Sequence, residues 1–134
     1  MASELRVTTI ANNAGSESVG TTYVINGSAK VWVNFNGQTT TTSRNSFNVS
    51  SLTDNGTGDT TVTVSNAFAD ADFSPLSGRE TSTSQTRPKL LNMSTDTSLS
   101  TTVSRYLSVE GTSSATVADE DCAFNFVAIH GDLA

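Results

Sequence analysis

Short runs in which apolar and polar residues alternate constrain the fold of this chain more than any other feature of its sequence. In the clearest run, Val31, Val33 and Phe35 lie on one side and Trp32 on the other, as in a half-buried β-strand. Residues 60–65 repeat the pattern, and no stretch of useful length has the helical period. The sequence therefore predicts an all-β fold, an antiparallel β-sandwich or barrel-like domain.

Turn residues between these runs divide the first half of the chain into strands. The Asn-Gly pair at 36–37 ends the first strand with a dipeptide typical of hairpins. Phe47 and Val49 open the next predicted strand, and Leu52 follows out of phase, which predicts a bulge just before it. Residues 54–59 read as a glycine-containing loop, so the strands on either side of it are expected to pair as an antiparallel hairpin.

The second half of the chain opens with a long polar tract and continues with a further predicted strand. Residues 74–101 are rich in Ser, Thr and Asn and predict long loops or weakly patterned strands. In the strand that follows, Val103, Leu107 and Val109 share one face and Tyr106 lies on the other. We expect the polar tract to carry the exposed, partner-facing loops, because binding residues concentrate on loops held by a rigid scaffold.

An acidic segment and an apolar strand end the sequence. Residues 118–121 are expected to form a solvated turn whose charges keep the next strand from pairing with other chains. Residues 124–130 are apolar on both faces, with Phe126 on one and Val127 on the other. A strand of this kind is typically central in a sheet or covered on both sides.

Two parts of the chain differ in character. Residues 1–28 are predicted to form an extended N-terminal segment, and residues 29–134 the β-sandwich-like domain. Leu5, Val7 and Ile10 favour one short strand in the segment and are candidates for an assembly anchor. Because the segment has too few apolar residues to fold alone, we expect it to dock on the main domain, a neighbouring subunit or a larger assembly.

Composition narrows the classes of partner. Ser and Thr make up 42 of the 134 residues, and charged residues only 15%. The net charge is −6 and the few Lys and Arg residues are scattered, which argues against a nucleic acid or an anionic membrane as partner. No apolar stretch approaches the roughly 18 residues of a membrane span. The first residues lack the apolar core of a secretion signal, so the protein is expected to be made and folded in the cytoplasm.

No pattern in the sequence points to catalysis or to a cofactor. The single histidine, His130, and the single cysteine, Cys122, are expected on one strand and too far apart to act together. The loop at 54–59 offers oxygen ligands for calcium but lacks the spacing of an EF-hand. We therefore predict a non-enzymatic β module with no catalytic residue, no metal and no cofactor.

Four residues are candidates for contact with a partner or ligand. Trp32 is a large aromatic on the outer face of its strand, where it would serve as a second-face core residue, a subunit-interface anchor or a stacking platform for a sugar. Tyr106 is a second candidate for glycan contact. Arg87 and Lys89 form a locally basic site within the polar tract.

A resemblance to a known family rests on two stretches. Residues 29–37 read AKVWVNFNG, and residues 46–59 read SFNVSSLTDNGTGD. Together they resemble a module of tail-fibre and other virion structural proteins of tailed phages, many of them marine or cyanobacterial. Residues 3–10 resemble the short leader that precedes this module, and residues 126–133 its usual end. The Thr-rich run at 38–43 departs from the family, which usually has an apolar strand there.

The resemblance implies a virion component that is made in the host cytoplasm and works by assembly and adhesion. We expect a fibre- or spike-like projection, a homotrimer that binds other virion proteins and contacts a glycan or protein of the host surface. A capsid decoration, or cement, protein is one alternative, and a free carbohydrate-binding β module is another. The family supplies no catalytic residues to carry over.

Overall fold

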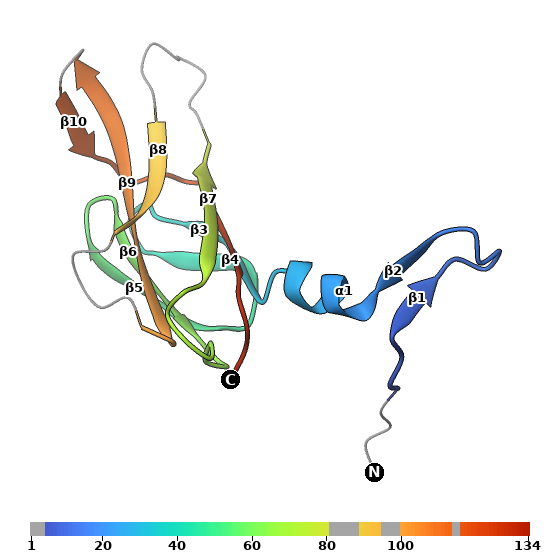
Figure 1. The fold of residues 1–134 in the computed structure, drawn as a ribbon. Coiled ribbons are helices and arrows are strands. Elements are labelled where there is room, and N and C mark those ends of the chain that lie inside the picture. Colours follow the sequence, from blue (N-terminus) through green and yellow to red (C-terminus); the bar gives the residue numbers. More distant parts are fainter. Residues whose placement is uncertain (1–4, 81–88, 95–99, 114–115) are drawn as a thin grey trace.

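A β-sandwich, as predicted, forms the body of the structure, a computed structural model that describes residues 5–80, 89–94, 100–113 and 116–134. Two antiparallel sheets pack against each other (Figure 1). The front sheet has the strand order β4-β3-β11-β7, and the back sheet contains β5, β6, β8, β9 and β10. The strands of the front sheet are β3 (Val31–Asn36), β4 (Thr42–Phe47), β7 (Ser74–Arg79) and β11 (Asn125–His130). Those of the back sheet are β5 (Val49–Gly56), β6 (Asp59–Val64), β8 (Lys89–Ser94), β9 (Val103–Ser113) and β10 (Thr116–Asp119).

Alternating side chains of both sheets meet in one hydrophobic core. Val31, Val33 and Phe35 point inward from β3, and Val62 and Val64 point inward from β6, as predicted. The other buried members of the core are Phe68, Phe73, Leu91, Tyr106, Val127 and Ile129. Burying one such side chain contributes about 1.5–3 kcal/mol, so the alternation in the sequence decides which face of a strand is covered.

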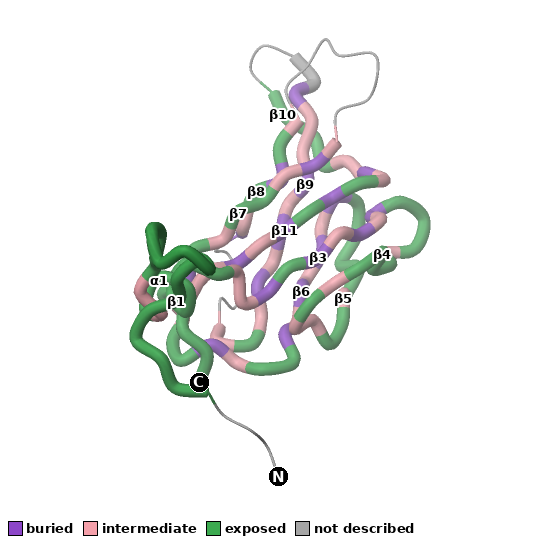
Figure 2. Tube along the Cα trace, turned by 90° about the vertical axis from the view of Figure 1, so that its right-hand side faces the viewer, coloured by how far each residue is buried: buried purple, intermediate pink, exposed green. Residues whose placement is uncertain are grey.

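The last strand, β11, is central in the front sheet, as its apolar composition predicted. It pairs with β3 on one side and with β7 on the other. Buried residues alternate with more exposed ones along β11 (Figure 2). Val127 and Ile129 are buried in the core, whereas Phe126 is exposed. The outer face of β11 is therefore apolar, yet nothing within the described chain covers it.

The prediction that Phe47 and Val49 share one strand is wrong. Phe47 ends β4 in the front sheet and Val49 begins β5 in the back sheet. Asn48 makes the crossing between the sheets with a φ of 58°, a left-handed conformation that asparagine tolerates better than most residues. Its side chain holds the crossing in place, because Oδ1 accepts the backbone N–H of Asn66 at 2.8 Å and Nδ2 donates to the carbonyl of Lys30 at 3.2 Å.

The predicted bulge and hairpin are confirmed in this region. The register between β5 and β6 shifts between Val49 and Ser51, immediately before Leu52. The two strands pair antiparallel, and the loop expected at 54–59 shortens to two residues because β5 continues to Gly56 and β6 starts at Asp59.

The two faces of β9 are the reverse of the prediction. Tyr106 is fully buried in the core, and the small side chains of Ser104 and Ser108 share its inward face. Leu107 and Val109 are half-buried on the outer face instead. Two serines on the core side made that face look solvent-exposed in the sequence, whereas a full tyrosine ring fills the space between them.

The acidic segment at 118–121 is not a solvated turn, and this prediction is wrong. Its first two residues belong to β10. Glu120 accepts hydrogen bonds from Arg79 and Lys89, two cations on neighbouring strands of the polar tract. That tract, residues 74–101, contains β7 and β8 rather than loops alone, while 81–88 and 95–99 lie outside the described residues.

Residues 5–28 form an N-terminal arm that projects from the sandwich (Figure 1). It contains a hairpin of β1 (Thr9–Ala11) and β2 (Ser18–Gly20), followed by the helix α1 (Thr21–Gly27). The strand predicted from Leu5, Val7 and Ile10 is thus partly wrong, because only Ile10 lies in β1. The helix was not predicted, since seven residues are too few to show a helical period.

Candidate functional site

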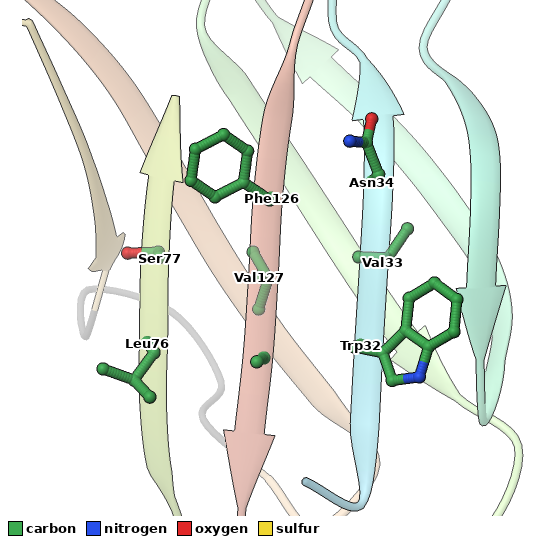
Figure 3. A pocket seen from close by; sticks show the side chains of 8 residues that line it. Trp32, Val33, Asn34, Leu76, Ser77, Phe126 and Val127 are labelled. Carbon is green, nitrogen blue, oxygen red and sulfur yellow. The ribbon is translucent and has the colours of Figure 1, made fainter. Parts of the chain in front are cut away.

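The outer face of the front sheet is the most apolar exposed surface of the sandwich. The strand register places Trp32 between Phe47 on β4 and Ala128 on β11, and Leu76 on β7 follows next to Ala128. Trp32 is 38% exposed and Leu76 62% exposed. Figure 3 shows these two side chains with Phe126 around one shallow hollow. A large exposed apolar patch of this kind typically marks an interaction site.

The hollow has a volume of about 370 Å³ and a floor made by three strands. Phe126 sits over Gly78 of β7, so closely that a Cβ atom at this glycine would lie 2.4 Å from the ring. The absence of a side chain at Gly78 therefore lets the Phe126 ring pack directly against the backbone of β7. Outside the hollow, on β4, the guanidinium of Arg44 lies 4.1 Å from the centre of the Phe124 ring and donates a hydrogen bond to the carbonyl of Ala123.

One polar group in the hollow lacks a partner. The side-chain oxygen of Asn34 is buried and accepts no hydrogen bond from any described residue. An unsatisfied buried acceptor costs about 1–3 kcal/mol, and this oxygen has almost no surface open to solvent. Trp32, which the sequence singled out, belongs to this site; Phe47, Leu76 and Phe126 were not singled out.

Among the other predicted contact residues, Tyr106 is not available to a ligand. Burial of its side chain raises the pKa of the hydroxyl to about 12 and removes it from the surface, so the prediction of glycan contact is wrong for this residue. The side chain of Lys89 is only 8% exposed and is paired with Glu110 at 3.7 Å and Glu120 at 3.1 Å. It is an internal cation rather than a contact point, and Arg87 lies outside the described residues.

The predicted assembly anchors lie on the N-terminal arm. Leu5, Val7 and Ile10 are all exposed. The arm exposes four more large hydrophobic residues, which the sequence reasoning did not include among the anchors: Val19, Tyr23, Val24 and Ile25. The apolar triplet at 23–25 was the available signal. No residue of α1 is buried, so the helix presents apolar side chains to a partner.

The residues considered for chemistry are held in structural roles or lie apart. Cys122 is buried before β11 starts, and His130 is its last residue. The two residues are thus at opposite ends of β11, which is about 20 Å long at the usual strand rise. Asp59 belongs to the loop at 54–59 that offered oxygen ligands for calcium. Its carboxylate accepts hydrogen bonds from Arg105 and Asn55, and the bond from Arg105 holds the pKa of this carboxyl below its ordinary value. Among the described residues, no three His, Cys, Asp or Glu side chains form a group able to hold a metal ion.

No protein-family model, curated protein or solved structure matches this chain. None of the described helices is long and apolar enough to cross a membrane. The apolar hollow on the front sheet and the exposed arm are therefore the two features on which a functional argument rests.

Proposed function

We propose that this chain is a non-enzymatic structural protein of a tailed-phage virion, which assembles with copies of itself into a fibre- or spike-like projection. The observation that carries the proposal is the N-terminal arm. It projects from the sandwich with seven large hydrophobic side chains exposed. An apolar arm attached to a folded domain is suited to assembly, because its exposed hydrophobic side chains are buried only when a partner covers them.

The resemblance of the sequence to virion proteins supports the same proposal. The stretch 29–37 becomes β3, and the stretch 46–59 runs from the end of β4 through β5 to the start of β6. The second stretch makes the crossing from the front to the back sheet, and the first carries Trp32 onto the apolar face. The arm precedes them directly.

The proposal is tested by locating the protein on particles and by measuring its size. Gold-labelled antibodies against the chain are expected to bind the tail of intact particles in electron micrographs. The purified protein is expected to have the mass of a trimer by light scattering. Labelling of the head faces would favour a capsid decoration protein instead, and a chain absent from particles would refute both forms of the proposal.

A carbohydrate-binding module is a second candidate, favoured by the partly exposed Trp32 ring on the apolar face. Aromatic rings stack on the apolar faces of sugars. This function predicts glycan-array binding that is lost in Trp32→Ala. A stable trimer without any array signal would exclude it.

A further inference from the structure

The arm and the apolar outer face of the front sheet lie on the same side of the sandwich. In Figure 1 the arm extends from the side of the sandwich on which the front sheet lies, and in Figure 2, turned by 90°, it lies at the lower left corner of that sheet. A molecule placed against the outer face of the front sheet would therefore lie beside the arm as well. Both apolar surfaces are therefore within reach of neighbouring copies on the same side of the sandwich.

The arm is too small to hold its structure without a partner. Its two strands have three residues each, its helix has seven, and none of its described residues is buried. An isolated two-stranded hairpin is marginal in water, and so is an isolated helix shorter than about 12 residues. Between residues 5 and 28 the only charged side chains are Arg6 and Glu17, and low charge is typical of the centre of a protein interface.

Contacts at its base direct the arm away from its own domain. The ammonium group of Lys30 donates hydrogen bonds to the carbonyls of Ile25 and Ser28 at the end of α1, and the backbone N–H of Lys30 donates to Ile129 of β11. The hairpin β1–β2 is a sheet of its own and pairs with no strand of the sandwich among the described residues. The front sheet of the same chain is therefore not the place where the arm packs.

We infer that the arm of one copy packs on the outer face of the front sheet of a second copy, where it covers the hollow formed by Trp32, Leu76 and Phe126. This inference rests on the proposed assembly function and names its contact. Both surfaces are apolar and nearly uncharged, and each chain supplies one of each, so every arm finds one face.

Contacts between two different surfaces of identical chains close into a ring when the rotation allows it. A ring of three such contacts would give the expected trimer. The arm of each chain would then pack on one neighbour, and the front sheet of the same chain would be covered by the arm of the second neighbour. The same contact also leaves the outer side of the back sheet open to other virion proteins.

Site-directed disulfide formation between copies tests the inference. Full-length chains with Cys122→Ser and Ile10→Cys are co-expressed with differently tagged chains with Cys122→Ser and Leu76→Cys, and are then oxidised. The expected product is a disulfide that joins the two tags, since only cysteines with Cα atoms within about 7 Å are bridged without strain. The control replaces Leu76→Cys by Ser51→Cys, an exposed position on β5 of the back sheet, and is expected to give no such product.

The strength of assembly gives a second, independent measurement. Leu76→Ser and Trp32→Ala are each expected to raise the dissociation constant of the assembly by about tenfold, because truncated interface anchors typically cost that much or more. Leu90→Ser, which changes an exposed leucine on the back sheet, is expected to leave the dissociation constant unchanged. Assembled protein that forms only arm-to-arm disulfides, or in which Leu90→Ser weakens assembly as much as Leu76→Ser, would overturn the inference and leave the proposed function intact. Protein that forms the arm-to-face disulfide but is absent from particles would refute the proposed function alone.

Discussion

Arg79 places a guanidinium group inside the sandwich, where its side chain is only 2% exposed. It donates hydrogen bonds to the hydroxyl of Ser108 and to the carboxylate of Glu120, both at 2.7 Å. Lys89 donates to the same carboxylate at 3.1 Å. Partial burial raises the pKa of Glu120, but the hydrogen bonds from Lys89 and Arg79 outweigh it and hold the pKa below its ordinary value. Glu120 thus pairs with two largely buried cations, of which Lys89 also has Glu110 at 3.7 Å.

Replacing this carboxylate tests its role. Glu120→Gln is expected to lower the free energy of unfolding by about 1–3 kcal/mol at pH 7, since it leaves buried charge uncompensated. Because the pKa of Glu120 is lower in the folded state, its contribution is complete above about pH 4.5, the ordinary value, and disappears as the pH falls through the folded pKa. Urea unfolding across this range is therefore expected to be less pH-dependent in Glu120→Gln than in the wild type.

The exposed neighbour of Glu120 provides the control for this experiment. Asp119→Asn removes a carboxylate from the same acidic segment, but Asp119 is exposed at the end of β10. It is expected to change the free energy of unfolding by less than about 0.5 kcal/mol. Equal effects of the two substitutions would mean that net charge, rather than the contact with Arg79, sets the stability.

At the scale of elements, the sequence predicts strands well where large aliphatic side chains alternate. β3 and β6 follow this pattern, and their buried faces are as predicted. For β11, which is apolar on both faces, only the central position in the sheet was predicted. The pattern fails where a core face is built from small polar residues, as with Ser104 and Ser108 around Tyr106 on β9. It also fails where a chain crosses between sheets without a glycine or proline, as at Asn48. Both outcomes depend on tertiary packing, which local periodicity does not record.

The candidate site was predictable only in part for a related reason. Trp32 is identifiable because its strand is otherwise regular, so a tryptophan on the outer face stands out. Leu76 and Phe126 lie in segments that are distant in sequence, and only the pairing of β7 and β11 brings them to the same hollow. Gly78 gives no sign in the sequence that its missing side chain makes room for an aromatic ring.

The independence of the arm and the sandwich leads to a prediction at this scale. No arm residue belongs to the hydrophobic core cluster, so deletion of residues 1–28 is expected to leave the sandwich folded. In dilute solution, where copies are dissociated, the midpoint of thermal unfolding by circular dichroism is expected to shift by less than about 5 °C. Phe35→Ala, in the core, serves as the positive control and is expected to cost about 3–5 kcal/mol. Loss of the β-sheet signal on deletion would show that the arm is part of the folding unit.

For the whole molecule, charge and apolar surface act in opposite directions on assembly. Each chain carries a net charge of −6, so copies repel one another at low ionic strength. The surfaces proposed to join them, the arm and the outer face of the front sheet, contain few charged groups. Attraction between copies would then come mainly from burial of apolar area, which salt does not screen, while the repulsion comes from charges distributed over the rest of the surface.

Salt is therefore expected to strengthen assembly. Raising sodium chloride from about 0.05 M to 0.5 M shortens the Debye length from about 14 Å to 4 Å, which removes most of the repulsion between chains. The dissociation constant measured by sedimentation equilibrium is expected to fall by about two- to tenfold. Leu76→Ser is expected to show the same salt dependence from a weaker starting point, because it removes apolar contact and no charge. If salt weakens assembly instead, ion pairs rather than the apolar face join the copies.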